Sequence, residues 1–182
     1  MKFKTITLIS FIFILSSCSF FESSNSKKLA SKNKELTNLN KKYKGKKIDL
    51  ITNLLNKVFK SKKDGDLSML IYYDANCSVC FMKLKKWESN IEYFKRLNDD
   101  LNIKFILYSE DSLVTDINLK ESNIPKSLVV YDNNNSYLRK YEHSIEYAYN
   151  TMLLNKDNEI IFIGSPQVSN NLKMHYTKLI KE

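Results

Sequence analysis

The chain has few cysteines and histidines, the side chains most typical of structural zinc sites: three cysteines and two histidines among 182 residues. A closed zinc site needs four ligands, so Cys77 and Cys80 would require two more. Only His143 and His175 are available, and neither lies at the spacing of paired ligands. Residue 81 is phenylalanine, which excludes the CxxCH signature of covalent haem attachment. The sequence therefore predicts no metal site and no cofactor, with copper delivery by the two cysteines left open as an alternative.

The chain begins with a hydrophobic run that is too short to span a bilayer. Ile6–Leu15 has about ten residues, whereas a spanning helix needs about twenty, and Lys2 and Lys4 precede it. Such a pattern is typical of an export signal. The run ends in Leu15-Ser16-Ser17-Cys18, which resembles the lipobox of bacterial lipoproteins, where the cysteine is lipidated. We expect residues 1–17 to be a signal peptide and Cys18 to anchor the chain in the cell envelope, facing the periplasm. An ordinary secretory signal with an incidental cysteine is the alternative, and it also exports the chain.

The net charge of +9 is concentrated near the N-terminus. Residues 22–63 hold thirteen lysines against three acidic residues, whereas residues 64–182 hold fourteen basic and seventeen acidic residues. The net positive charge therefore lies before the expected folded core, which follows from Leu67. We interpret residues 18–45 as a basic, flexible tether that lies against anionic lipid headgroups. An exported chain of this kind is not expected to bind nucleic acid.

A hydrophobic strand followed by an amphipathic helix surrounds the cysteine pair. The continuous apolar and aromatic run 68–73 predicts a buried strand, and 74–76 is a short break. Asn76 is a good N-cap for a helix that begins at Cys77. Apolar residues then recur at three- and four-residue spacing, which predicts one helix of roughly five turns. They are Leu84, Trp87, Ile91, Phe94 and Leu97.

This position suits the two cysteines to redox chemistry. The first turn of a helix has unpaired N–H groups and the positive end of the helix dipole, so a sulfur there is stabilised as thiolate, the nucleophilic form. Cysteines three positions apart lie on the same side of a helix and can form a disulfide with little movement. Such a small loop has little value as a structural crosslink. Cys77 is the expected attacking sulfur and Cys80 the resolving one.

The rest of the chain predicts a strand–helix–strand unit followed by a hairpin and a helix. Residues 48–59 form either a strand and a helix or a helix alone. A second strand over 101–108 follows the long helix, so it must be parallel to the first. The remaining expected elements are a surface helix over 112–120, a strand over 127–131, a hairpin of 151–155 with 159–163, and a terminal helix over 170–181.

Together these features resemble the thioredoxin fold over about residues 46–182. The resemblance implies an α/β domain with a mixed central sheet flanked by helices, preceded here by an N-terminal extension. The extra strand near Leu128 resembles the insertion in membrane-tethered thioredoxin-like proteins. In that family the residues matching Cys77 and Cys80 are the nucleophilic and resolving cysteines, the substrates are protein thiols or disulfides, and a redox partner recharges the pair.

Two positions depart from the family pattern. Thioredoxins usually carry tryptophan before the first cysteine, where this chain has Asn76. They also carry a cis-proline at the start of the hairpin strand, where this chain has Asn150 if 151–163 is the hairpin. A rival register uses Ile124-Pro125, with 127–141 as the hairpin. In the preferred register, the resemblance implies that Asn76, Asn150 and Thr151 contact substrate, with a trans peptide at Asn150.

Two functions follow from the sequence. The first is a lipid-anchored thiol–disulfide oxidoreductase that uses Cys77 and Cys80. The alternative is a non-catalytic lipoprotein in which the same fold is a binding scaffold, because fold alone does not fix function. The missing tryptophan and proline favour this alternative.

Overall fold

The structure is a computed structural model that describes residues 29–50, 52–59 and 67–182. The expected signal peptide and Cys18 lie outside the described residues. The chain divides into two compact units, Met1–Lys41 and Lys42–Glu182, whereas the sequence analysis placed the start of the folded domain at residue 46. Each unit is considered by itself.

Residues 29–43 form a helix within the stretch expected to be a flexible tether. This helix was not predicted, and the role of the stretch as a tether stays a prediction. Among the described residues, no helix combines the length and the apolar character needed to cross a membrane.

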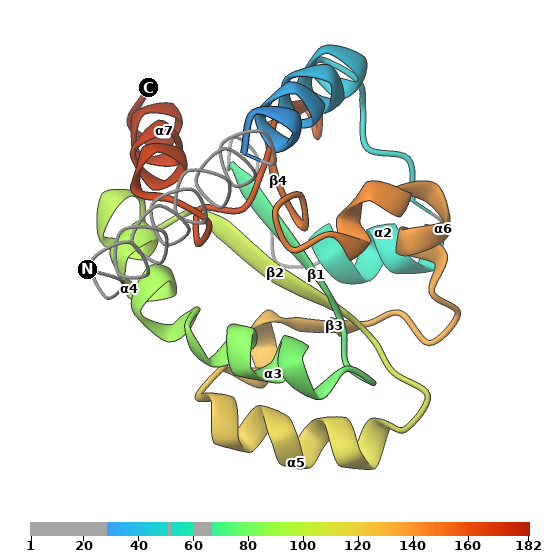
Figure 1. Ribbon diagram of the computed structural model, residues 1–182. Coiled ribbons are helices and arrows are strands. Elements are labelled where there is room, and N and C mark those ends of the chain that lie inside the picture. The colour runs from blue at the N-terminus through green and yellow to red at the C-terminus, as the bar shows by residue number, and fades with distance from the viewer. Residues whose placement is uncertain (1–28, 51, 60–66) are drawn as a thin grey trace, which may run out of the picture. The chain divides into compact units, whose positions relative to one another are not determined.

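The larger unit is built on a five-stranded sheet in the order β3-β2-β1-β4-β5 (Figure 1). Strands β1 (Ser68–Asp74), β2 (Asn102–Tyr108) and β3 (Val129–Tyr131) are parallel. Strand β4 (Thr151–Leu154) is antiparallel to β1, and β5 (Ile160–Ile163) is antiparallel to β4. The mixed central sheet that the sequence predicts is therefore present.

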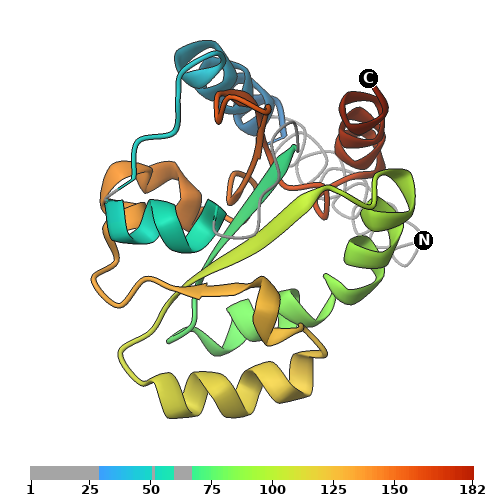
Figure 2. The same ribbon diagram turned by 180° about the vertical axis from the view of Figure 1, so that it is seen from behind.

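Helices cover both faces of this sheet (Figures 1 and 2). On one face, side chains of β1 and β2 share a core with residues of four helices: α3 (Ser78–Lys85), α4 (Glu88–Leu97), α5 (Ser112–Ser122) and α7 (Asn170–Lys181). On the other face lie α2 (Thr52–Phe59), α6 (Ser136–Lys140) and a 3₁₀ turn, Glu142–Ile145. A second 3₁₀ turn, Lys126–Leu128, precedes β3.

Strand β1 is buried on both faces, which explains why its sequence is continuously apolar instead of alternating. Ile71 and Tyr73 belong to the core beneath α3 and α4. Tyr72 points to the opposite face, where its ring stacks on Tyr137 of α6 at 5.6 Å between centroids. Helices therefore enclose the strand that leads to the cysteines, which fixes its end in place.

The predicted five-turn helix is wrong in one respect, because the structure breaks it into α3 and α4. At the junction, Lys86 donates to the carbonyl of Lys83 at 3.2 Å and Trp87 to that of Leu84 at 2.9 Å. These bonds between residues three apart tighten the last turn of α3 into 3₁₀ geometry. The junction places the ring of Trp87 entirely inside the core. Neither proline nor glycine marks the break, so no local residue predicts it.

The preferred hairpin register is confirmed and the rival register is wrong. Strands β4 and β5 form the hairpin, with Asn158 in the left-handed region at its turn (φ 63°). Strand β3 is parallel to β2 and is followed by α6, so residues 127–141 cannot be a hairpin. The terminal helix α7 has the predicted bounds, and the hydroxyl of Ser169 caps it. Residues 48–59 hold α2, preceded by an isolated bridge between Lys47 and Glu159.

Candidate functional site

Cys77 and Cys80 lie at the carboxyl end of β1, where α3 begins. Cys77 is itself the N-cap, with extended backbone angles (φ −98°, ψ 109°), and the helix starts at Ser78. The predicted helix start at Cys77, with Asn76 as the cap, is therefore wrong by one residue. The Cys77 side chain makes no capping hydrogen bond. Both cysteines are reduced and half-buried, so one sulfur sits at the very opening of the helix and the other one turn further on.

The turn before Cys77 is held by polar contacts to the next loop of the sheet. A carboxylate oxygen of Asp74 accepts from both the backbone and the side-chain N–H of Asn76, each at 3.0 Å. The side-chain oxygen of Asn76 accepts from the backbone N–H of Glu110 at 3.1 Å. Ala75 donates to the carbonyl of Tyr108 at 2.8 Å. Asn76 therefore links the β1–α3 turn to the β2–α5 connection, and its predicted contact with substrate stays a prediction.

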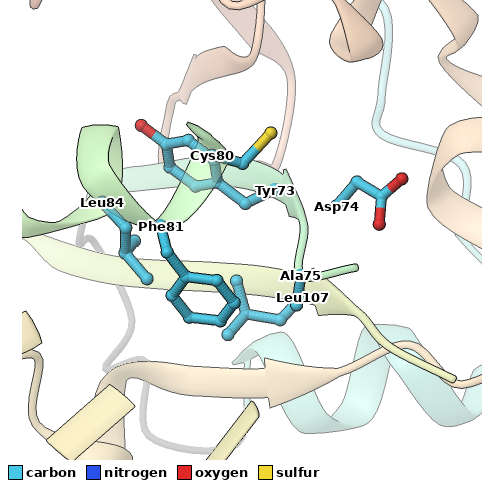
Figure 3. Close-up of a pocket in the computed structure, with 7 residues that line it drawn as sticks. All are labelled: Tyr73, Asp74, Ala75, Cys80, Phe81, Leu84 and Leu107. Atoms are coloured by element: carbon cyan, nitrogen blue, oxygen red, sulfur yellow. The ribbon is translucent and has the colours of Figure 1, made fainter. Parts of the chain in front are cut away.

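Cys80 lies in a small, mostly apolar pocket beneath this turn (Figure 3). Burial, and then hydrogen bonding with Cys77, raise the pKa of Cys80 to about 12. Cys80 therefore stays a thiol at neutral pH. The residues lining the pocket are Tyr73, Asp74, Ala75, Cys80, Phe81, Leu84 and Leu107.

A hydrogen-bonded aromatic pair supports this pocket from the core. The ring nitrogen of Trp87 donates to the hydroxyl of Tyr73 at 3.0 Å. Burial raises the pKa of Tyr73 well above its ordinary value, so its hydroxyl stays neutral. The sequence analysis did not place Tyr73 in the site. Its place four residues before Cys77, on the inner face of β1, is the signal that could have identified it.

Asn150 and Thr151 lie at the start of β4, beside β1. Tyr72 donates its N–H to the carbonyl of Asn150 at 2.8 Å, and the Asn150 side chain donates back to the carbonyl of Tyr72 at 3.1 Å. The hydroxyl of Thr151 donates to the side-chain oxygen of Asn150 at 3.0 Å. Both residues are buried, and these side-chain contacts join β4 to β1. Their contact with substrate stays a prediction. No cis peptide bond occurs in the described residues.

The two histidines lie on separate elements of the fold. His143 is in the 3₁₀ turn Glu142–Ile145, and His175 is in α7. Within the described ranges, no three side chains of histidine, cysteine, aspartate or glutamate are grouped so that they could hold a metal ion.

Comparison with known proteins supports the fold and does not assign the chain to a sequence family. No protein-family model and no curated protein sequence matches the chain. Among solved structures, it is similar to the N-terminal domain of PilB from N. meningitidis in its reduced form, at 16% identity and a TM-score of 0.50, over 69% of this chain and 85% of that one. It is also similar to a putative thiol:disulfide interchange protein DsbE from Chlorobium tepidum, at 12% identity and a TM-score of 0.50, over 76% of this chain and 96% of that one.

At these identities, the comparisons show the fold alone. The chain has a thioredoxin-like fold: a mixed sheet flanked by helices, with a CxxC pair where β1 passes into α3. The expected fold class is confirmed.

Proposed function

We propose that the protein is a thiol–disulfide oxidoreductase in which Cys77 attacks and Cys80 resolves. One observation carries the proposal: Cys77 caps α3 at the end of β1, and Cys80 follows one turn further on in the same helix, with both residues half-buried and neither in a disulfide. The start of a helix presents unpaired N–H groups to the attacking sulfur, and reactive cysteines are commonly found at this position. The name of one structural neighbour, a putative thiol:disulfide interchange protein, agrees with this chemistry.

The reaction proceeds in two exchanges. The Cys77 thiolate attacks one sulfur of a substrate disulfide, which forms a mixed disulfide and releases the other substrate sulfur as a thiolate that takes up a proton. Cys80 then loses its proton and attacks the Cys77 sulfur, which closes the Cys77–Cys80 disulfide and releases the second substrate thiolate. One disulfide is formed and one is broken, so two electrons pass from the cysteine pair to the substrate. After this reaction, a dithiol redox partner reduces the Cys77–Cys80 disulfide again. In reverse, the same steps oxidise a substrate dithiol, and a redox partner that carries a disulfide then re-oxidises the cysteine pair.

Removal of Cys80 tests this assignment. In Cys80→Ser, the mixed disulfide at Cys77 has no resolving sulfur, so a protein or peptide disulfide should stay bound and be visible on non-reducing gels and by mass spectrometry. Cys77→Ser is the matched control and should trap much less, because the remaining thiol is half-buried and its pKa is about 12. If Cys80→Ser traps nothing, or both variants trap equally, the non-catalytic scaffold becomes the better explanation.

We also propose that a lipid on Cys18 attaches the oxidoreductase to the membrane of the cell envelope, where its substrates would be protein thiols and disulfides. Support comes from the sequence: two lysines, a ten-residue apolar run and the Leu15-Ser16-Ser17-Cys18 ending. Cys18→Ala should move the protein from the membrane to the soluble fraction and abolish incorporation of radiolabelled fatty acid. Unchanged membrane attachment of Cys18→Ala would refute the lipid anchor without affecting the redox proposal.

A further inference from the structure

Helix α5 buries Leu119 in the core, but it also presents two apolar side chains to solvent and buries two polar ones. Leu113 and Ile117, four residues apart on one face, are 75% and 59% exposed. Thr115 and Ser122, by contrast, are buried. In an amphipathic helix the apolar side chains normally all lie against the core. The orientation of α5 therefore leaves the apolar area of Leu113 and Ile117 in water.

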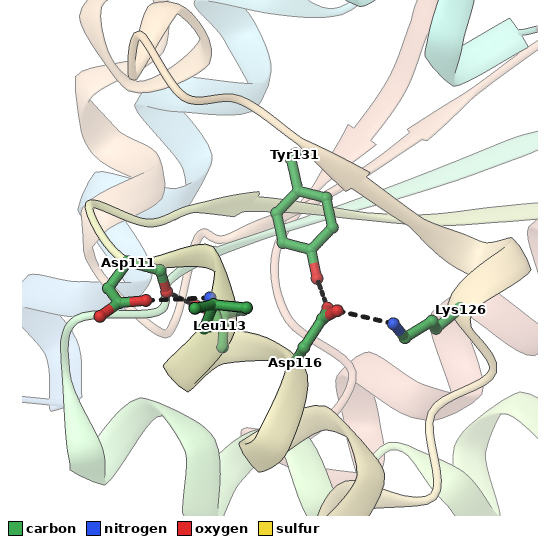
Figure 4. Close-up of polar contacts among 6 residues, drawn as sticks. Asp111, Leu113, Asp116, Lys126 and Tyr131 are labelled. Atoms are coloured by element: carbon green, nitrogen blue, oxygen red, sulfur yellow. Dashed lines mark hydrogen bonds and ion pairs between the residues drawn. The ribbon is translucent and has the colours of Figure 1, made fainter.

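Specific polar contacts hold α5 in this orientation (Figure 4). A carboxylate oxygen of Asp111 caps the first turn by accepting the N–H of Leu113 at 2.9 Å. Asp116 forms an ion pair with Lys126 at 2.7 Å and accepts a hydrogen bond from the hydroxyl of Tyr131.

The buried hydroxyl of Thr115 is hydrogen-bonded to Ser109 at 2.6 Å and to the carbonyl of Asp111 at 2.9 Å. A rotation that buried Leu113 would break these contacts, so its exposure is built into the fold.

Helix α3 continues this apolar area to the cysteines. Val79, between the two cysteines, is 50% exposed, and Met82 is 61% exposed. Helices α3 and α5 lie side by side in both views (Figures 1 and 2) and are linked by an ion pair of Lys85 with Glu121 at 3.4 Å. The bond from Glu110 to Asn76 fixes the loop before α5 to the turn before Cys77.

We define the α3–α5 surface as Val79, Met82, Leu113 and Ile117. Among the described residues, these are four of the eight large hydrophobic side chains that are exposed. Isolated exposed apolar residues need no explanation, but a concentration of them beside a reactive group indicates a binding surface.

We propose that the α3–α5 surface binds a polypeptide substrate through apolar side chains that flank its cysteine. This inference rests on the proposed function, because Val79 lies in the first turn of α3, two residues after Cys77. A small disulfide can reach Cys77 without touching α5, so only a polypeptide gains from the apolar area. Two ion pairs lie beside the surface, Lys85 with Glu121 and Asp116 with Lys126, and within each pair the fields on a charged ligand partly cancel. The flexible side chain of Met82 suits varied apolar partners.

Two peptides that differ only beside the cysteine test this proposal. Each carries one cysteine in a disulfide with 5-thio-2-nitrobenzoate, flanked on both sides by leucine in one peptide and by serine in the other. Release of the coloured thiol by the reduced full-length chain, in detergent micelles, gives the rate of attack by Cys77. The leaving group is the same, so the ratio of the two rates reports recognition of the flanks.

We expect the leucine peptide to react about tenfold faster, a difference of about 1.4 kcal/mol. In the double variant Met82→Gln/Ile117→Gln, the ratio of the leucine rate to the serine rate should fall below about threefold. Each rate is divided by the same variant's rate with 5,5′-dithiobis(2-nitrobenzoate), which corrects for any change in the reactivity of Cys77. The control Met174→Gln/Ile145→Gln changes two similarly exposed residues elsewhere and should keep the tenfold ratio.

Two results would overturn the proposal. One is a ratio near unity in the wild type, or an undiminished ratio in the Met82→Gln/Ile117→Gln variant. The other is a wild-type dimer that this variant converts to a monomer in light scattering, which would make the surface a contact between copies of the chain. Failure of the proposed function looks different, because then the wild type would not react with 5,5′-dithiobis(2-nitrobenzoate) faster than the Cys77→Ser variant.

Discussion

Deprotonation of Cys80 should limit the second half of the reaction. Cys80 must become a thiolate before it can attack the mixed disulfide, yet burial and its hydrogen bond to Cys77 raise its pKa to about 12. The positive charge of Lys83 lowers the pKa of Cys80, but its contribution is the smallest and does not offset the others. The perturbation that tests this is a change of pH during resolution of the mixed disulfide.

The size of the effect follows from the two pKa values. Relative to an ordinary thiol of pKa 9.0, a pKa of about 12 lowers the thiolate fraction at pH 7 about thousandfold. The more basic thiolate is the better nucleophile by about twentyfold, at a Brønsted coefficient of about 0.45. Resolution should therefore be about 50-fold slower than with an unperturbed cysteine. This is an upper figure, because Cys77 carries no negative charge in the mixed disulfide, whereas the burial of Cys80 persists.

Acid-quenched mixing with a peptide disulfide measures this step directly. Mass spectrometry of samples quenched after milliseconds to seconds gives the amount of mixed disulfide at Cys77. Its decay rate should rise about tenfold for each pH unit between pH 6 and pH 8, since the thiolate fraction rises by that factor. The Cys80→Ser variant should show no decay at any pH. A decay rate that is independent of pH over this range would refute the reasoning, because it would mean that Cys80 is already ionised or passes its proton to a base.

Two polar groups outside the cysteine pair, the half-buried His143 and the buried Asn150, should control stability. Burial, with repulsion from Lys42, lowers the pKa of His143 to about 4. The unfolded chain therefore takes up this proton at higher pH than the folded one, and stability is lost as pH falls from about 6.5 to about 4, by about 1–2 kcal/mol after allowance for partial exposure. In urea titrations at pH 7 and pH 4, His143→Phe should remove that part of the loss, and an equal loss in both proteins would contradict this. Asn150→Ala leaves the buried hydroxyl of Thr151 without its acceptor and should lower the free energy of unfolding by about 1–3 kcal/mol. The control Asn133→Ala changes an exposed residue and should change the free energy of unfolding by less than about 0.5 kcal/mol. Similar small effects in both variants would count against the role of Asn150.

Much of the fold could be predicted because local pattern and tertiary environment agree. Strand β1 is enclosed on both faces, and its sequence is accordingly a continuous apolar run. Helix α7 has a capping serine directly before a periodic apolar face, so its bounds were predictable to the residue. The turn at Lys156-Asp157-Asn158 fixed the hairpin, because asparagine tolerates the left-handed backbone that Asn158 adopts.

The features that could not be predicted depend on contacts between distant segments. The break between α3 and α4 places Trp87 against Tyr73, fourteen residues earlier, and no local residue marks it. Asn76 was predicted to be a helix cap, but its side chain is hydrogen-bonded to Asp74 and to Glu110, which lies 34 residues away. The orientation of α5 depends on contacts of Asp116 with Tyr131 and Lys126, which belong to the next elements of the chain. The cysteines themselves were found because the strand, the turn and the helix around them are all local.

The two proposals can be separated kinetically, because they concern different steps. The α3–α5 surface contacts a substrate before any bond forms, so it controls how often a productive encounter reaches Cys77. Once the mixed disulfide exists, a covalent bond of far greater strength than any apolar contact holds the partner, and its lifetime depends on the proton of Cys80. Substitution of Met82 or Ile117 should therefore slow formation of the mixed disulfide without lengthening its lifetime. A rise in pH should shorten that lifetime, with little effect on the ratio of the rates measured with the leucine and serine peptides. A variant of the surface that prolonged the intermediate would show that α5 also positions Cys80, and the division of roles between helix face and buried thiol would be wrong.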